Sequence, residues 1–231
     1  MRGWHITVSP GQAALRLFAA ITLTIWAAAS PAPAQTHAPS RSPTQSRSRS
    51  EAAKEHPDIE RSPDAYEIYS LLVPGEALAK MAPSLNQRWA IAAMTVSASD
   101  ISPALAPEAA LKPPKDDPQG FREAAADYET RKDERLRLVR DFHLKQPYSL
   151  LTPEEVSEFR TARSTPTAPS ALRQKYSGYP GITYFSQVFF NSKQTAALVY
   201  MVDWCGNLCS GAQWVYLEKQ GGRWIRRSGR P

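Results

Sequence analysis

The stretch ITYFSQVFFNSKQTAALVYMVDWCGNLCSGAQWVYLEKQGGRWIRR, residues 182–227, decides the fold expected for this chain. β-Branched and aromatic residues fill four runs, separated by short connections rich in Gly, Asn and Ser, which is typical of β-hairpins. Strands joined by short loops pair with each other, so these runs predict an antiparallel meander. The four expected strands are Ile182–Phe190, Thr195–Trp204, Gly211–Lys219 and Arg223–Arg227.

Helices are expected before this sheet. Ser62-Pro63 is a helix start, and a longer helix is predicted from Pro118 to about His143. Thr152-Pro153-Glu154-Glu155 combines a capping threonine with a glutamate three residues later, which opens another helix. WAIAAMTV, residues 89–96, favours a strand, with a short helix as the alternative. The sequence therefore predicts an α+β domain with N-terminal helices packed on one face of a C-terminal four-stranded antiparallel meander.

The first 34 residues have the pattern of a cleaved secretory signal. Arg2 and Arg16 precede an apolar run, Leu17–Ala29, and small residues follow at Ala32-Pro33-Ala34. The run is shorter than the roughly 20 residues that span a bilayer. We therefore expect residues 1–34 to be removed, which leaves no transmembrane segment and places the protein in the periplasm or outside the cell. An uncleaved anchor is the alternative.

Residues 35–62, rich in Ser, Arg and Pro, are expected to be a disordered tether because they hold too few apolar side chains to offset the entropy of ordering. Residues 63–231 are expected to form a single α+β domain that includes a cysteine hairpin at 195–219. The chain carries a net charge of +6, but basic and acidic residues are evenly mixed from residue 63 onward. This balance argues against a nucleic-acid partner.

The only two cysteines, Cys205 and Cys209, lie in the expected turn between two strands. With Gly206-Asn207-Leu208 as a three-residue loop, they would lie directly across from each other. A disulfide is expected in an oxidising compartment. Free thiols, a redox-active pair and a metal site are the alternatives. A metal would need further ligands, and only His56 and His143 follow the signal, so no metal site is predicted.

Residues Tyr184–Trp224 resemble the C-terminal motif of a family of uncharacterised exported bacterial proteins. The family pattern is SxVGFN, then ALVY, then CGxLCG, then LxK and GxW. Phe189 and Ser210 stand where the pattern has glycine. The resemblance implies a recurring structural unit around the cysteine hairpin, and it implies no activity. The matching residues are Ser186, Val188, Phe190, Asn191, Ala197 to Tyr200, Cys205, Gly206, Leu208, Cys209, Leu217, Lys219, Gly222 and Trp224.

Catalytic motifs are absent from the sequence. It contains neither a Gly-x-Ser-x-Gly elbow nor a phosphate-binding Gly-rich loop. His143 is interpreted as a helix-end histidine that interacts with the helix dipole; a general base beside Asp141 or Glu155 is the alternative. No catalytic residue and no cofactor is therefore predicted.

Aromatic residues are dense in the C-terminal third, and they either form the core or bind a ligand on the sheet. We expect a non-enzymatic binding or interaction module, whose partner in the cell envelope is a protein or a small ligand. A thiol-disulfide redox protein using Cys205 and Cys209, and a structural envelope protein, are the alternatives. The candidate ligand-binding residues are Trp204, Trp214, Tyr216 and Asp203.

Overall fold

The computed structural model describes residues 57–81, 88–100, 106–207 and 209–227; the predicted signal and most of the predicted tether lie outside these residues. Helices and strands occur in the following order along the chain: α1 Pro63–Leu72, α2 Glu76–Met81, β1 Trp89–Ala92, a 3₁₀ turn Ala98–Asp100, α3 Pro107–Ala110, α4 Pro118–Arg131, β2 Tyr148–Leu151, α5 Pro153–Ser164, α6 Ser170–Lys175, β3 Ile182–Phe185, β4 Phe189–Phe190, β5 Ala196–Gly206, β6 Cys209–Gln220 and β7 Arg223–Arg227.

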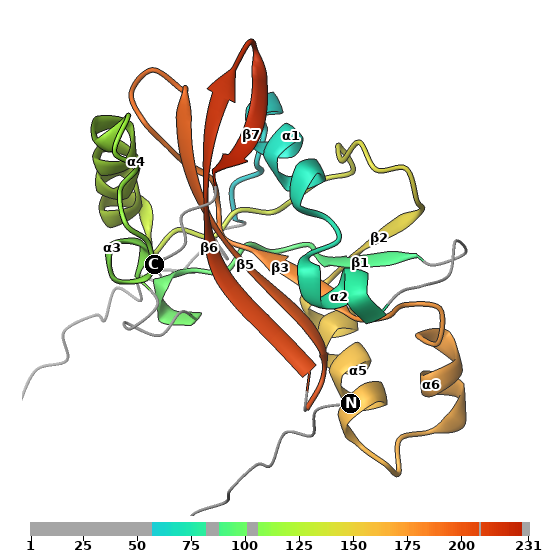
Figure 1. Ribbon diagram of the computed structural model, residues 1–231. Helices are drawn as coiled ribbons and strands as arrows, with labels where there is room; N and C mark the ends of the chain where they lie inside the picture. Colours follow the sequence, from blue (N-terminus) through green and yellow to red (C-terminus); the bar gives the residue numbers. More distant parts are fainter. Residues whose placement is uncertain (1–56, 82–87, 101–105, 208, 228–231) are drawn as a thin grey trace, which may run out of the picture. The chain divides into compact units, whose positions relative to one another are not determined.

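A seven-stranded mixed sheet lies at the centre of the described fold. The strand order is β2-β1-β3-β5-β6-β7, and the short β4 pairs with β5 beside this path. β1 pairs in parallel with both β2 and β3, whereas the pairs from β3 to β7 are antiparallel. The long β5–β6 hairpin crosses the view of Figure 1, with α4 on one side and α1 on the other.

Two helix starts follow the sequence signals. The Ser62 side chain accepts a hydrogen bond from the backbone N–H of Ala65, which satisfies one of the free amides at the start of α1. At α5, the Thr152 side chain accepts from the N–H of Glu155, and the Glu155 carboxylate accepts from the N–H of Thr152. Both predicted N-termini are therefore confirmed, the second as a complete capping box.

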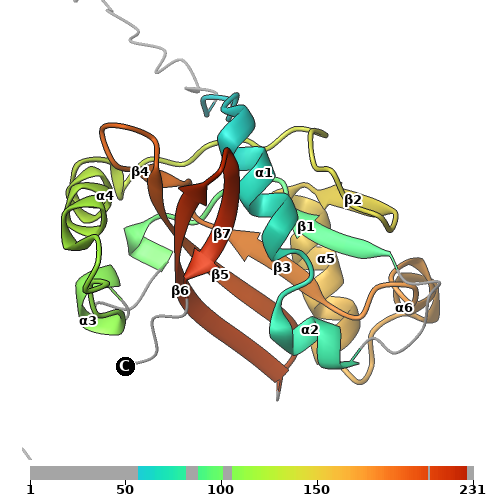
Figure 2. The same cartoon turned by 45° about the horizontal axis from the view of Figure 1, so that its top comes forward.

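The two faces of the sheet carry different helices, because successive side chains of a strand point to opposite sides. We call the side covered by α1 and α2 the closed face; Val199, Met201 and Asp203 of β5 point to it. We call the side covered by α4 and α5 the open face; Val202 and Trp204 point to it. Figure 2 shows α5 against the β1–β3 part of the sheet.

The predicted fold class is wrong. The sheet has seven strands and is partly parallel, and helices cover both of its faces, so this is not a four-stranded antiparallel meander with N-terminal helices on one face. The cause lies outside the C-terminal stretch. β1 and β2 come from earlier parts of the chain and extend the sheet beyond β3 through parallel pairs. Short loops indicated the antiparallel pairs correctly, but no local signal indicates pairing between segments so far apart.

The predicted helix from Pro118 to His143 ends at Arg131. Its buried residues end at Tyr128, after which charged residues leave no apolar stripe to hold a helix against the sheet. The chain instead continues in extended form, and the N–H of Leu138 donates to the carbonyl of Ala93 at 2.8 Å. His143 is consequently not at a helix end. It lies exposed in the connection to β2.

Described residues that precede the first helix are bonded to a later part of the chain. The N–H of Arg137 donates to the carbonyl of Asp58 at 2.7 Å, and the N–H of Glu60 donates to the carbonyl of Arg137 at 3.0 Å. Ile59 thus forms an isolated parallel bridge with Arg137. These contacts place the last residues of the expected tether against the connection that follows α4.

Candidate functional site

A groove of about 470 Å³ opens on the open face beside α5, and we call it the α5 groove. One wall is the α5 side chains Val156 and Arg160, which lie four residues apart and so share one face of the helix. The other wall is the segment Met94–Asp100 together with Arg135. The volume lies within the roughly 300–1,000 Å³ of small-molecule sites in proteins.

The floor of the groove is formed by strand ends. Ala92 and Leu151 are the last residues of β1 and β2, and Tyr184 is next to the last residue of β3. These three strands are parallel to one another, so their carboxyl ends meet at one edge. In α/β sheets, ligands bind characteristically outside the carboxyl ends of parallel strands. Val202 and Trp204 of β5 complete the floor.

The Tyr184 hydroxyl is the polar group of the floor. It is buried, and it has no hydrogen-bond partner among the residues that the structure describes. Burial raises the pKa of Tyr184 above its ordinary value, an effect that the nearby positive charge of Arg160 opposes. The hydroxyl is therefore protonated at neutral pH and can both donate and accept a hydrogen bond.

Two arginines line the groove, and their surroundings differ. Arg135 forms an ion pair with Asp100 at 2.8 Å. The guanidinium of Arg160 lies over the Trp204 ring, 5.5 Å from the ring centroid. Among the described residues, no carboxylate lies within ion-pair distance of Arg160. The groove therefore contains one neutralised arginine and one whose charge is not balanced by an acidic partner.

The four candidate ligand-binding residues are not brought together. Trp204 lines the groove. Trp214 and Tyr216 also point to the open face, but both are buried under α4, where Tyr128 contacts Trp214 and Phe121 contacts Tyr216. Trp214 and Tyr216 share one face, as strand alternation requires, but α4 covers that face and both residues belong to the core. Asp203 lies on the opposite face of the sheet.

Asp203 is buried at the contact between β5 and α2. Its carboxylate accepts a hydrogen bond from the Thr183 hydroxyl at 2.9 Å and further bonds from the backbone N–H groups of Leu78 and Ala77. A Cβ atom at Gly75 would overlap this carboxylate, so glycine is needed where the chain enters α2. Burial raises the Asp203 pKa above its ordinary value, and these hydrogen bonds oppose the rise. Asp203 thus acts in the structure as a cap for α2.

The two cysteines lie at the end of the β5–β6 hairpin. Their sulfur atoms are at disulfide distance, and their Cα atoms are 5.2 Å apart. Gly206, with a φ of +141°, rather than Cys205 pairs with Cys209, and the register shifts between Trp204 and Gly206. The expectation that the cysteines lie directly across from each other is therefore wrong, because a β-bulge places Cys205 out of register. Cys205 packs against Leu78 and Trp89 on the closed face, away from the groove.

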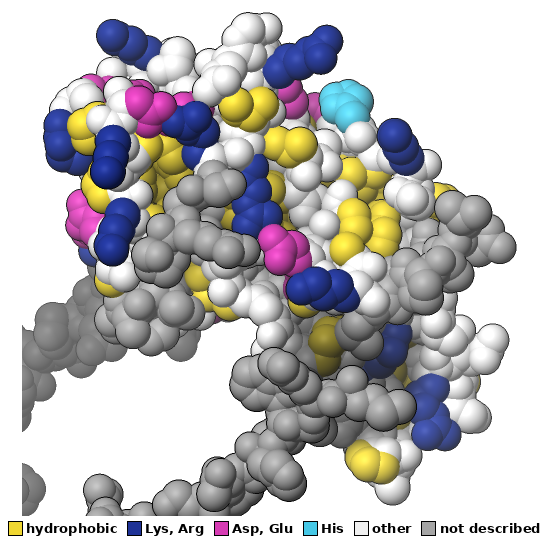
Figure 3. All heavy atoms as spheres, in the orientation of Figure 1, with side chains coloured by type: hydrophobic (Ala, Val, Ile, Leu, Met, Phe, Trp, Pro, Cys, Tyr) yellow, Lys and Arg dark blue, Asp and Glu magenta, His cyan; other side chains and the backbone are white. Residues whose placement is uncertain are grey.

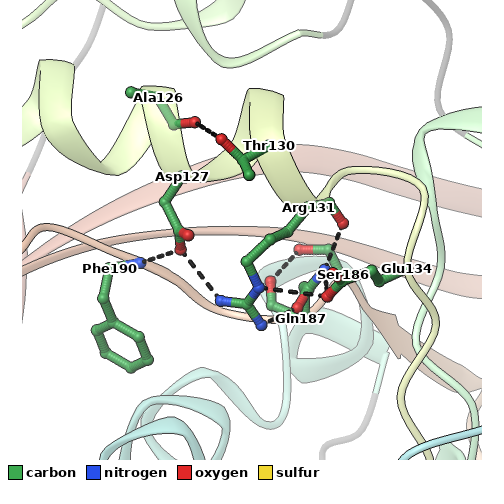
Figure 4. Close-up of polar contacts among 8 residues, drawn as sticks. All are labelled: Ala126, Asp127, Thr130, Arg131, Glu134, Ser186, Gln187 and Phe190. Atoms are coloured by element: carbon green, nitrogen blue, oxygen red, sulfur yellow. Dashed lines mark hydrogen bonds and ion pairs between the residues drawn. The ribbon is translucent and has the colours of Figure 1, made fainter.

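A polar network holds the chain that leads from α4 toward the groove (Figure 4). Arg131 forms an ion pair with Asp127 at 3.2 Å, and it also donates to the Gln187 side chain. The amide nitrogen of Gln187 donates to the carbonyl of Arg131 at 2.6 Å. Asp127 in turn accepts from the N–H of Phe190 at 3.0 Å. The members of this network bind one another, so we assign it a structural role.

Sequence reasoning missed Arg160 and the hydroxyl of Tyr184. Arg160 lies on the polar side of an amphipathic helix, where a charged residue is unremarkable by itself, and its contact with Trp204 depends on the tertiary fold. Tyr184 lies two residues after Ile182 in β3, so strand alternation indicates that the two side chains share a face. No sequence pattern indicates that this face lies open beside α5.

Charge and metal-ligand patterns in the described residues point to no other kind of site. Lys and Arg side chains are scattered over the face shown in Figure 3, with acidic side chains among them. Within the described ranges, no group of three or more His, Cys, Asp or Glu side chains is arranged to hold a metal ion. The helices of the described part are all too short or too polar to cross a membrane.

Comparison of the chain with family models, curated proteins and solved structures finds no match. The resemblance of Tyr184–Trp224 to exported bacterial proteins therefore stays a prediction.

Proposed function

We propose that this protein is an exported, non-enzymatic binding module that holds a small, mainly apolar ligand in the α5 groove. The observation that carries the proposal is the position of the groove at the carboxyl ends of three parallel strands, with Tyr184 in its floor, whose buried hydroxyl has no partner among the described residues. The described residues that line it are mainly apolar and include neither histidine nor cysteine. Binding accounts for these features without a catalytic group.

The two alternatives have less support. A redox role requires a reactive thiol, commonly one at a helix N-terminus, whereas Cys205 and Cys209 lie in a hairpin turn with Cys205 on the closed face. A purely structural envelope protein has no use for a groove with an unpartnered hydroxyl. These arguments favour binding over both alternatives.

The test is a substitution that fills the groove. Val202 is half-buried in the floor, so Val202→Phe replaces its isopropyl group with an aromatic ring that projects into the space a ligand would occupy. Val139→Phe is the matched control, because Val139 is exposed and does not line the groove. Binding of octan-1-ol and octanoate to the full-length protein is measured by ligand-observed NMR.

We expect at least one of the two probes to bind the wild type, Val202→Phe to weaken that binding about tenfold or more, and Val139→Phe to leave it unchanged. If neither probe binds the wild type, or if Val202→Phe binds them as well as the wild type does, the proposed function is wrong.

Export is part of the same proposal, and the intact mass of the exported protein tests it. We expect a mass that begins at Gln35, with Cys205 and Cys209 protected from alkylation until strong reduction, as a disulfide in an oxidising compartment predicts. A mass that retains residues 1–34 contradicts the cleaved signal. Rapid alkylation after mild reduction would instead favour the redox alternative.

A further inference from the structure

The unbalanced charge of Arg160 determines what kind of ligand head group the groove would prefer. The guanidinium of this exposed side chain lies over the Trp204 ring, 5.5 Å from the ring centroid, which is within the range of a cation–π contact. The N–H donors along the guanidinium edge are then left for another partner. A planar carboxylate matches this edge because it can accept two parallel hydrogen bonds.

The other charged and polar side chains of the groove are already engaged. Asp100 is paired with Arg135, so these two charges cancel. The Thr95 hydroxyl oxygen accepts a hydrogen bond from the N–H of Leu136 at 2.7 Å. Arg160 therefore gives the lining one net positive charge, which corresponds to a ligand with one negative charge.

Tyr184 lines the same groove, and its buried hydroxyl is a second donor without a partner among the described residues. Burial raises the Tyr184 pKa, and the positive charge of Arg160 opposes this rise. A buried hydroxyl without a partner loses the hydrogen bonds it would make to water, and a ligand oxygen would restore one of them. The rest of the floor, formed by Ala92, Leu151 and Val202, is apolar.

We infer that the α5 groove takes an amphipathic monocarboxylate, whose head group is bound by Arg160 and Tyr184 and whose apolar chain lies along the floor. This inference rests on the proposed function, because it identifies the chemical class of the ligand for the same groove. The apolar chain gains by leaving water, and the carboxylate selects this class over a neutral ligand of the same length.

The experiment compares octanoate with octan-1-ol, which have the same chain length but differ in charge. Affinities for the full-length protein are measured at low salt and at neutral pH, where the carboxylate is ionised. We expect octanoate to bind the wild type about tenfold more tightly than octan-1-ol, as a charge-assisted hydrogen bond requires. If octan-1-ol binds as tightly as octanoate, the inference is wrong while the proposed function stands. Failure of both probes overturns the proposed function itself.

Arg160→Gln removes the charge that the inference depends on. We expect it to weaken octanoate binding about tenfold and octan-1-ol binding much less, so that the preference for octanoate is lost, while the octan-1-ol binding that remains shows that the variant is folded. Arg122→Gln is the matched control. It makes the same charge change on the exposed side of α4, away from the groove. An equal effect of both variants on octanoate would show that the protein's overall charge, rather than Arg160, attracts the ligand.

Tyr184→Phe tests the second donor. We expect octanoate binding to weaken about fivefold, as the loss of one neutral hydrogen bond predicts, with no loss of thermal stability because the hydroxyl has no partner among the described residues. Unchanged octanoate affinity in this variant would remove Tyr184 from the site. Octyl phosphate serves as a further arm, and tighter binding of octyl phosphate than of octanoate would overturn the assignment of a carboxylate.

Discussion

Two buried polar groups on neighbouring strands, one on each face of the central sheet, differ in their hydrogen bonding. On the closed face, Asp203 is buried at 3% exposure, and its carboxylate is bound by Thr183 and by the start of α2. On the open face, the hydroxyl of Tyr184 is buried with no partner among the described residues. Thr183 and Tyr184 are adjacent in β3, so one strand supplies a satisfied polar contact to one face and an unsatisfied one to the other.

A polar group that is bonded within the fold differs in its effect from one that is available to a ligand. A polar group that is buried and fully bonded stabilises the fold, and the closed face is filled by α1, whose Tyr69 is buried and donates to the carbonyl of Ser186 at 3.0 Å. A polar group that is buried without a partner costs stability unless something else binds it. An unpartnered polar atom does not by itself mark a site, because Trp89 Nε1 and Trp224 Nε1 on the closed face are also buried without a partner among the described residues. Tyr184 differs because it lines the α5 groove.

Truncation of one side chain on each face gives the largest expected contrast. Phe185 points to the closed face, is fully buried and packs against the Tyr69 ring with centroids 4.8 Å apart. We expect Phe185→Ala to lower the free energy of unfolding by about 3–5 kcal/mol. Val202→Ala, in the floor of the groove, should cost only about 1 kcal/mol because the side chain is already partly exposed. Urea denaturation of both variants measures the difference, and equal costs would mean that the open face is packed as tightly as the closed one.

The antiparallel half of the fold could be predicted from the sequence, and the parallel half could not. Strands β5, β6 and β7 are joined by short connections, so their pairing is local and their residue types indicate it. β2 is only Tyr148–Leu151, and its partner β1 lies far away in the chain. The predicted helix beyond Arg131 is wrong for the same reason, because the segment that follows α4 is bonded to a distant part of the chain. The N–H of Leu138 donates to the carbonyl of Ala93, and this contact outweighs local helix propensity.

The candidate site could be predicted only in part. An aromatic residue at Trp204 was a reasonable candidate from composition, because exposed tryptophans often bind ligands. Trp214 and Tyr216 carry the same residue types, and only the position of α4 decides that they are core. Asp203 directly precedes Trp204, yet strand alternation places the two on opposite faces. The sequence predicts this alternation. It does not predict the parallel pairs of β1 with β2 and β3, on which the opening beside α5 depends.

A smaller effect is expected from the polar group of the closed face. Asp203→Ala would leave the Thr183 hydroxyl and the amides of Ala77 and Leu78 without their acceptor. We expect a loss of about 1–3 kcal/mol in the free energy of unfolding. Asp203→Asn keeps the shape and one acceptor oxygen but removes the titratable group, so a comparison of wild type with this variant isolates the contribution of ionisation.

The pH dependence of that comparison has a definite sign. Burial raises the Asp203 pKa above 3.8 in the folded protein, so the folded state holds a proton that the unfolded state has already released. The stability of wild type relative to Asp203→Asn is therefore highest below pH 3.8 and falls as the pH rises through the folded pKa. Urea denaturation between pH 3 and 6 measures this difference. A relative stability that rises over the same range would mean that the hydrogen bonds from Thr183 and α2 outweigh burial, and that the closed face favours the charged carboxylate.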